Sequence, residues 1–277
     1  MARAKKNKNL ERIKDGLMDV FGQVYRDFKS AIPAQKDRFM VSAKIKFLEV
    51  QRSLLGKTMV ILGPPAAGKT TLLRVLQNPE VTGRELQSYR KTEVDEIKSF
   101  RCKWKIRVVG EEQIEFCFKV RKTSDVGGES YVRENHWGKA IRDAEILVYV
   151  FDVKAFLDDK DGGYKTRIKE DFDWLLVNSQ KPKINFALIL VANKSDLYCD
   201  RTTYPEFENS HKENLAKFAD ELREMWKAGL RSNIKGVTFL SLTDDILRHL
   251  TFDNLMLGFI GDDLRSLYVE SRSRKVT

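Results

Sequence analysis

The chain has 277 residues, of which 42% are hydrophobic and 32% are charged, and its formal net charge is +10. This composition supports a packed core with a solvated surface, and the length allows one large domain or one domain with an extension. Cys102, Cys117 and Cys199 show neither metal-ligand spacing nor a disulfide framework. We find no apolar run long enough to span a bilayer and no signal peptide, so we expect a reducing, cytoplasmic location.

Residues 1–52 are predicted to form a basic, amphipathic helical extension. The first fourteen residues contain six Lys and Arg side chains and a single Glu. Apolar residues then recur at three- and four-residue steps from Leu10 to Phe28, and a similar pattern follows Pro33. Such spacing marks one face of each of two helices.

Three interpretations of this extension stay open. The helices pack on the rest of the protein or on each other, they contact an anionic membrane through residues 1–30, or they bind a partner macromolecule. Nucleic acid is the least favoured partner, because the basic residues lack interleaved aromatic side chains.

A phosphate-binding loop is predicted between a strand at 57–62 and a helix at 70–76. The loop reads Gly63-Pro64-Pro65-Ala66-Ala67-Gly68-Lys69-Thr70. This is the P-loop pattern in the context that the motif requires. Its glycines let successive N–H groups point at phosphate oxygens, Lys69 adds a positive charge, and the Thr70 hydroxyl suits Mg²⁺. We therefore predict that a nucleoside triphosphate is held by Gly63, Ala66, Ala67, Gly68, Lys69, Thr70 and Thr71.

An antiparallel hairpin is predicted next, from alternating strands at 100–108 and 114–120 around Gly110. Asp125-Val126-Gly127-Gly128 follows the second of these strands. Asp125 is placed to support the Mg²⁺ shell through water. Gly128 is able to bring its backbone N–H against a γ-phosphate, which a residue with a Cβ would hinder.

The remaining strands are mostly apolar runs at 146–151, 186–191 and 237–240, separated by helical segments at 168–178, 213–228 and from 244 onward. Parallel strands covered on both faces have this composition. Residues 53–277 are therefore predicted to form one α/β domain with a doubly wound, mostly parallel sheet, whose ligand lies at the carboxyl ends of the strands.

The base of the nucleotide is predicted from Asn193-Lys194-Ser195-Asp196, which ends the strand at 186–191. An ionised Asp accepts hydrogen bonds but donates none. Guanine offers adjacent N1–H and N2–H₂ donors and adenine does not, so Asp196 favours guanine.

These motifs together resemble the Ras-superfamily GTPases, and most closely the Arf/Sar branch, over about residues 56–270. The likeness rests on Ala66–Thr71, Asp125–Gly128, Asn193–Leu197 and the loop Phe239–Thr243. It implies a G domain that binds GTP or GDP with Mg²⁺. It also implies a set of residues around the base: Asn193, Lys194, Asp196, Ser241, Leu242 and Thr243.

Several positions depart from that pattern. Pro64 and Pro65 stiffen the loop, and Glu129 stands where many relatives have a Gln that orients the attacking water. The first switch should carry a threonine that closes on Mg²⁺ and the γ-phosphate, for which Thr92 is the better candidate and Thr82 the alternative. The resemblance thus implies Thr70, Thr92 and Asp125 around the metal, and it assigns catalysis to Lys69, Thr92, Gly128 and Glu129.

The resemblance implies a molecular switch that hydrolyses GTP slowly and binds a protein effector and a regulator. A second interpretation is a nucleotide-locked binding module with little hydrolysis, which Pro64, Pro65 and Glu129 favour. A P-loop kinase is disfavoured, because Asn193-Lys194-Ser195-Asp196 serves no purpose there.

Overall fold

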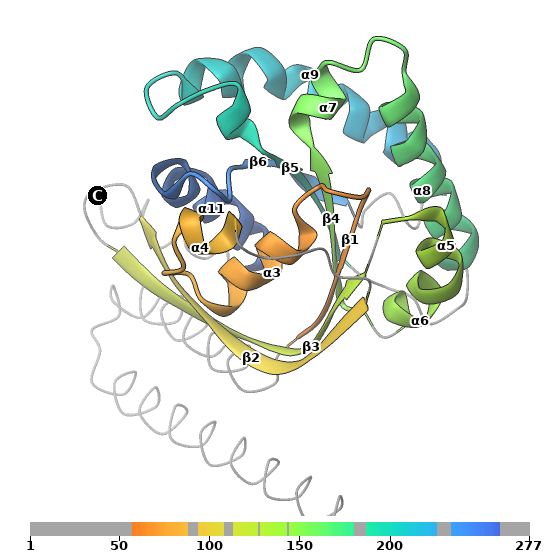
Figure 1. Cartoon of the computed structure of the whole chain (residues 1–277), viewed down its shortest axis with the longest axis horizontal. Coiled ribbons are helices and arrows are strands. Elements are labelled where there is room, and N and C mark those ends of the chain that lie inside the picture. Colours follow the sequence, from red (N-terminus) through yellow and green to blue (C-terminus); the bar gives the residue numbers. More distant parts are fainter. Residues whose placement is uncertain are drawn as a thin grey trace, which may run out of the picture.

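The computed structural model describes residues 57–87, 94–107, 113–126, 128–142, 144–179, 187–225 and 234–260. The helices predicted within residues 1–52 and the candidate switch residue Thr92 lie outside this part of the chain. The described residues form a six-stranded sheet with helices on both faces (Figure 1). The strand order is β2-β3-β1-β4-β5-β6.

The strands run as predicted, with one antiparallel edge. Their bounds are β1 Lys57–Leu62, β2 Val94–Arg107, β3 Gln113–Val126, β4 Ile146–Asp152, β5 Ala187–Asn193 and β6 Ile234–Leu240. β2 pairs antiparallel with β3, and every other neighbouring pair is parallel. The predicted hairpin and the doubly wound, mostly parallel sheet are confirmed. However, β2 begins six residues before the predicted start at 100, and β3 continues six residues past 120, so Asp125 and Val126 lie inside the strand and not after it.

The helical elements fall between these strands. They are α3 Lys69–Gln77, α4 Gly83–Gln87, α5 Ser130–Val132, the π-helix η1 Arg133–Trp137, α6 Gly138–Ile141, α7 Val153–Leu157, α8 Gly163–Ser179, the 3₁₀-helix η2 Ser195–Leu197, α9 Tyr204–Met225 and α11 Asp245–Ile260. Four of these helices, at 69–77, 163–179, 204–225 and 245–260, were expected from the sequence. The third of them begins nine residues earlier than the predicted start at 213, because Pro205 occupies its first turn, where no N–H is needed.

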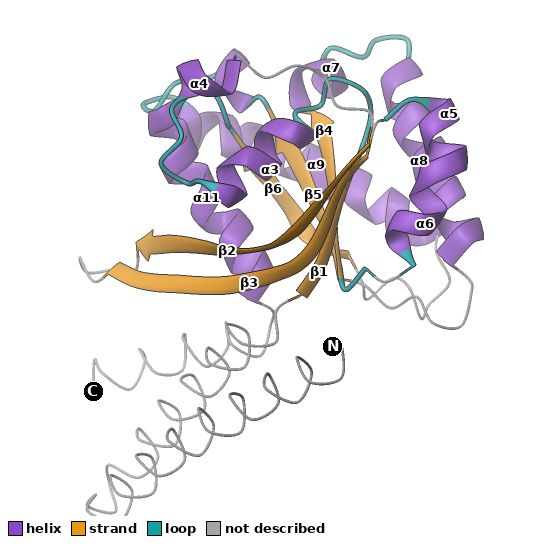
Figure 2. Ribbon diagram, turned by 60° about the horizontal axis from the view of Figure 1, so that its bottom comes forward, coloured by secondary structure: helices purple, strands orange, loops and turns teal. Residues whose placement is uncertain are grey.

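Helices lie on both faces of the sheet (Figure 2). A hydrophobic cluster packs between the sheet and the helices on each face. In β1, Met59 and Ile61 face the cluster that includes α3 and α11, while Val60 and Leu62 face the cluster that includes α8 and α9. This alternation follows from the two-residue period of a strand. Cys102 is buried in the first cluster as a free thiol.

The site lies where the order of the strands reverses. β1 stands between β3 and β4, and the chain leaves it for opposite halves of the sheet. Asp152, Asn193 and Leu240, at the carboxyl ends of β4, β5 and β6, are neighbours in the register. Open α/β sheets bind ligands at such a switch point, outside the carboxyl ends of their strands.

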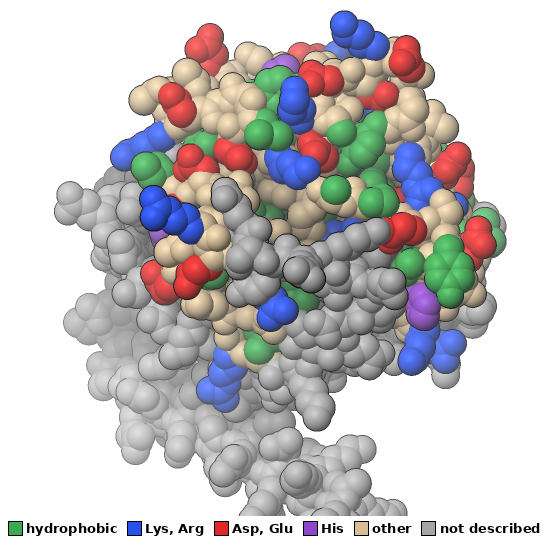
Figure 3. Space-filling view, viewed as in Figure 1, with side chains coloured by type: hydrophobic (Ala, Val, Ile, Leu, Met, Phe, Trp, Pro, Cys, Tyr) green, Lys and Arg blue, Asp and Glu red, His purple; other side chains and the backbone are tan. Residues whose placement is uncertain are grey.

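The surface of the described residues carries mixed charges. On the face shown in Figure 3, Lys and Arg side chains alternate with Asp and Glu side chains, with no extended area of one sign among the coloured residues. Among the described helices, none combines the length and the apolar composition that a membrane crossing requires.

A substitution at Gly63 tests how closely the start of the loop packs against β4. Its φ is +140°, and a Cβ placed there would lie 1.9 Å from the carbonyl oxygen of Val150 in β4. We expect Gly63→Ala to lower the free energy of unfolding by about 2–4 kcal/mol, because both the backbone and β4 must shift. Urea denaturation measures this change.

The matched control is Gly163→Ala at the start of α8, where no heavy atom lies within 4 Å of the added Cβ. It should change the free energy of unfolding by less than about 1 kcal/mol. Equal effects of the two substitutions would contradict this account of the packing between the loop and β4.

Candidate functional site

The loop after β1 curls around its own lysine. Gly63 and Gly68 have positive φ values of 140° and 97°, and Ala66 also adopts a left-handed backbone with φ 57°. The ammonium of Lys69 donates to the carbonyl oxygens of Gly63 at 3.0 Å and Pro64 at 2.7 Å. These two contacts hold the Lys69 side chain against the backbone at the start of the loop.

Helix α3 begins directly behind this loop. Gly68 is its N-cap residue, and the first turn contains no acidic side chain. Thr70 and Thr71 therefore lie at a helix N-terminus, where the direction of the N–H groups and of the helix dipole favours an anion. The predicted phosphate-binding residues, from Gly63 to Thr71, form one continuous segment at this end of β1.

The second predicted motif meets the first through Asn193. Its amide nitrogen donates to the carbonyl oxygen of Ala67 at 2.9 Å, and the residue is buried. The contact is so close that a Cβ on Gly68 would lie 2.2 Å from that nitrogen. Gly68 is thus required by Asn193 as well as by its own backbone angle.

Asp196 is oriented by the loop that follows β6. Its two carboxylate oxygens accept from the hydroxyl groups of Ser241 at 2.7 Å and Thr243 at 3.1 Å. Leu242, between them, is buried. The structure therefore joins the residues that the sequence assigned to the base, although they lie more than forty positions apart in the chain.

Lys194 points elsewhere. It has a left-handed backbone with φ 70°, and its ammonium pairs with Asp152 at 2.6 Å. Asp152 also caps α7, because its other carboxylate oxygen accepts from the backbone N–H groups of Lys154 and Ala155. The sequence analysis did not single out Asp152, which links the ends of β4 and β5.

Arg248 of α11 contacts the loop at residues 241–243 after β6, which we call the base loop. Its guanidinium donates to the carbonyl oxygens of Leu242 at 3.1 Å and Val81 at 2.5 Å, and it pairs with Asp245 at 2.8 Å. The side chain is only 3% exposed. Arg248 therefore ties the loop after β6 to the chain that leads into α4, a role with no signal in the local sequence.

Gly128 rests on the phosphate-binding loop. A Cβ placed on it would lie 2.2 Å from the Gly63 carbonyl oxygen and 2.5 Å from the Pro65 nitrogen. Glu129 precedes α5 and its carbonyl accepts the backbone N–H of Arg133 at 2.9 Å. Gly128 thus lies against the loop, and Glu129 follows it in the chain. Their roles at the γ-phosphate stay predictions.

The remaining predicted residues are only partly placed. Asp125 is the second-to-last residue of β3, and its backbone is paired in register with Ile61 of β1, but its side chain is not among those described. Thr82 accepts from and donates to Glu85 in a capping box at the start of α4. Its hydroxyl is committed to that cap, which favours Thr92 as the switch threonine.

A family model described as the ADP-ribosylation factor family matches residues 46–221. The chain belongs to the Arf family. Its members are GTP-binding proteins, so the Arf-like resemblance read from the motifs is confirmed. A search of curated proteins finds no match.

Two solved structures are similar to this Arf-family chain. A chain of the mammalian SRP receptor is 19% identical with a TM-score of 0.42, and the alignment covers 74% of this chain and 100% of that one. A chain of the signal recognition particle receptor SRb-GTP/SRX complex from Chaetomium thermophilum is 16% identical with a TM-score of 0.41, covering 67% of this chain and 91% of that one.

The described side chains fit a guanine nucleotide. Two buried oxygens beside Asp196, Asn193 Oδ1 and Ser195 Oγ, have no hydrogen-bond partner among the described residues. Such atoms are costly to leave unpaired, and a polar base edge would satisfy them. The nearby Cys199 thiol donates to the Ser195 carbonyl oxygen. Burial raises the pKa of this thiol to about 11, so it stays protonated at neutral pH.

Removing the buried cation of α11 tests the support of the base loop. We expect Arg248→Met to lower the free energy of unfolding by about 2–4 kcal/mol, because the carbonyls of Val81 and Leu242 lose a charged donor. Lys217→Met is the control, since Lys217 is 67% exposed and pairs only with Glu213 on its own helix. That change should stay within about 0.5 kcal/mol in the same urea titration. Similar losses would contradict the role of Arg248.

Proposed function

We propose that this Arf-family protein is a guanine-nucleotide switch that binds GTP or GDP with Mg²⁺ and hydrolyses GTP slowly. The observation that carries the proposal is the bond from Asn193 to Ala67. It brings the phosphate-binding loop and the Asp196 carboxylate to one side of the sheet, so a single nucleotide is able to span them.

Selection of the base falls to Asp196. Ser241 and Thr243 donate to its carboxylate and hold it in one orientation. An oriented acceptor pairs with the two adjacent donors of guanine. Adenine leaves the same partly buried carboxylate short of a partner, which disfavours it by about 3 kcal/mol or more, equivalent to at least about 100-fold.

At the phosphate end, the ammonium of Lys69 supplies the positive charge. The N–H groups at the start of α3 and the Lys69 ammonium neutralise the phosphate oxygens. The Thr70 hydroxyl, together with Thr92 and Asp125, would hold Mg²⁺, whose preferred ligands are oxygens. When bound, the metal supplies further neutralisation of the charge that develops during phosphoryl transfer.

The slow rate of GTP hydrolysis in this proposal is attributed to Glu129. Phosphoryl transfer needs an oriented water and a positive surrounding field. Glu129 directly follows Gly128, which lies against the phosphate-binding loop. A carboxylate near the γ-phosphate would repel it and leave the incoming water poorly oriented. A partner that supplies positive charge would then set the rate.

The switch segments are proposed to control a protein partner. Tyr131, two residues after Glu129, is 71% exposed, so a large apolar side chain stands beside the nucleotide end of the sheet. We further propose that residues 1–30 contact an anionic membrane from the cytoplasm, on the strength of their basic composition.

The proposal is tested at Asp196. Purified wild-type protein should bind fluorescent GDP and GTP at least about 100-fold more tightly than the adenine nucleotides. Asp196→Asn should lose most of this preference and gain affinity for xanthine nucleotides, because an amide nitrogen donates to the oxygen that replaces the guanine amino group. Equilibrium titration with each labelled nucleotide measures both.

Asp200→Asn is the matched control. Its carboxylate accepts from Thr202 and Thr203 at the exposed start of α9, so it should leave base preference unchanged. The proposed function fails when the wild-type protein shows no preference for guanine, or when Asp196→Asn keeps it.

Hydrolysis is tested at Glu129. Glu129→Gln removes a negative charge and retains a group that orients water, so we expect single-turnover GTP hydrolysis to accelerate about tenfold, equivalent to about 1.4 kcal/mol in the barrier. Nucleotide affinity should change less than about threefold. The exposed Glu134→Gln on η1 serves as control, and an unchanged or slower rate for Glu129→Gln would refute the role given to Glu129.

A further inference from the structure

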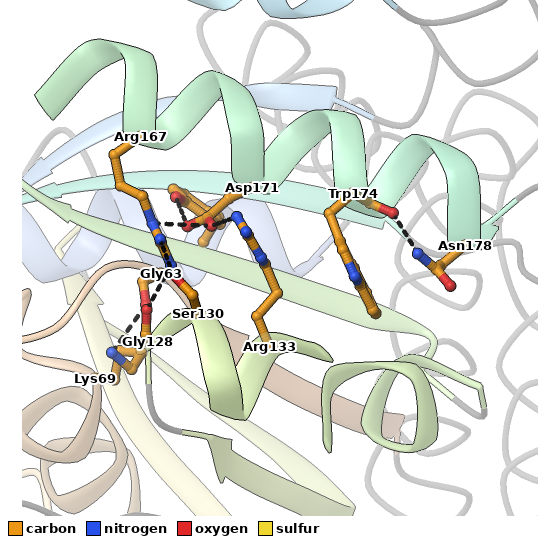
Figure 4. Close-up of polar contacts among 10 residues, drawn as sticks. Gly63, Lys69, Gly128, Ser130, Arg133, Arg167, Asp171, Trp174 and Asn178 are labelled. Carbon is orange, nitrogen blue, oxygen red and sulfur yellow. Dashed lines mark hydrogen bonds and ion pairs between the residues drawn. The ribbon is translucent and has the colours of Figure 1, made fainter. Parts of the chain in front are cut away.

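A fully buried carboxylate on α8 has two hydrogen-bond donors and one further guanidinium in ion-pair contact around it. Asp171 is 0% exposed, and the Tyr149 hydroxyl in β4 donates to it at 2.7 Å. Figure 4 shows Asp171 between Arg167 and Arg133. Arg133 of η1 contacts the same carboxylate at 2.8 Å, and Arg167, one turn earlier on α8, does so through its Nε at 3.3 Å. Burying a carboxylate without such partners would be costly.

Arg167 uses its other nitrogens on a different part of the chain. Nη2 donates to the carbonyl oxygen of Gly128 at 2.8 Å, and Nη1 donates to the hydroxyl of Ser130 at 2.6 Å. The planar guanidinium thus connects Asp171 on one edge to the turn before α5 on the other. A fixed fork of donors suits this bridge, and a lysine ammonium would not reach both sides.

This turn is the one that rests on the phosphate-binding loop. The close approach of Gly128 to Gly63 and Pro65 leaves no room for a side chain. Asp171 holds both ends of the segment from 128 to 133, through Arg167 at its start and Arg133 at its end. Trp137 of η1 packs edge-on against Trp174 of α8, with ring centroids 5.9 Å apart, and extends the same contact.

We propose that Arg167, oriented by Asp171, is a positioning residue that holds Gly128 against the phosphate-binding loop and thereby favours the triphosphate over the diphosphate. The inference rests on the proposed nucleotide switch. The Gly128 N–H is able to meet a terminal phosphate only while this segment lies on the loop. The hydrogen bond from Arg167 to the Gly128 carbonyl oxygen is made while the segment lies on the loop, and it stabilises that position.

Because binding and conformation are linked, a contact made in one arrangement of the segment raises affinity for the ligand that selects that arrangement. The contribution of Arg167 therefore appears in the affinity for GTP and is largely missing from the affinity for GDP.

The test uses the full chain and two fluorescent probes, GDP and a non-hydrolysable GTP analogue, at one Mg²⁺ concentration. Arg167 is 22% exposed, so Arg167→Met is compatible with folding. We expect affinity for the GTP analogue to fall about 10- to 30-fold, as for loss of a charged hydrogen bond. Affinity for GDP should change less than about twofold.

Lys169→Met is the matched control, because Lys169 lies on the same helix and pairs with Glu221 of α9 at 2.8 Å. It should leave both affinities unchanged. Arg167→Lys keeps the charge but lacks the fork, so it should also lose preference for the GTP analogue. A wild-type ratio in Arg167→Lys would show that charge alone suffices and would overturn the positioning role.

Equal losses for both nucleotides in Arg167→Met, or no loss for either, would overturn the inference while leaving the nucleotide site itself intact. Failure of the wild-type protein to bind either probe would instead contradict the proposed function. The two failures are therefore distinguishable in one titration series.

Discussion

The hydrogen bond from the Asn193 amide to the Ala67 carbonyl joins the two halves of the site. One partner belongs to the loop after β1 and the other to the end of β5, so the bond fixes how far the phosphate end lies from the base end. Gly68 accommodates it, since any side chain there would collide with the same amide. A nucleotide spanning both ends then meets a site whose length is set before it binds, which limits the ordering required of the protein.

Two arginine side chains extend this constraint to the helices behind the loops. Arg248 anchors the base loop to α11 on one face of the sheet, and Arg167 anchors Gly128 to α8 on the other. In both cases a guanidinium holds a backbone carbonyl of a loop and an acid of its own helix. The loops are therefore positioned by side chains from the rigid layers, although the residues that face the ligand come from the loops themselves.

The sequence predicted the parts of this arrangement whose chemistry is local. Glycines around Lys69, apolar strands and the acid at Asp196 are each legible within a few residues, because backbone curvature, burial and base recognition demand particular residue types. Arg248 and Val81 are 167 positions apart, and Arg167 and Gly128 are 39 apart. An arginine on a helix is usually a solvated side chain, so only the folded topology reveals that these two donate to backbone carbonyls of distant loops. The short helix α7 was missed for a related reason, since its cap, Asp152, reads locally as the end of a strand.

The two prolines of the loop make the position of Gly128 more important for binding phosphate. Proline has no backbone N–H, so Pro64 and Pro65 offer no donor to a phosphate, and the Pro64 carbonyl is already occupied by Lys69. Neutralisation of the outer phosphates in a GTP-bound state then falls more heavily on Lys69, on the N–H groups that open α3, and on a donor brought from outside the loop. Gly128 is the described backbone that lies against those prolines. A loop poorer in donors thus makes the protein more dependent on the segment that Arg167 holds in place, and couples discrimination between GTP and GDP to the packing of α8.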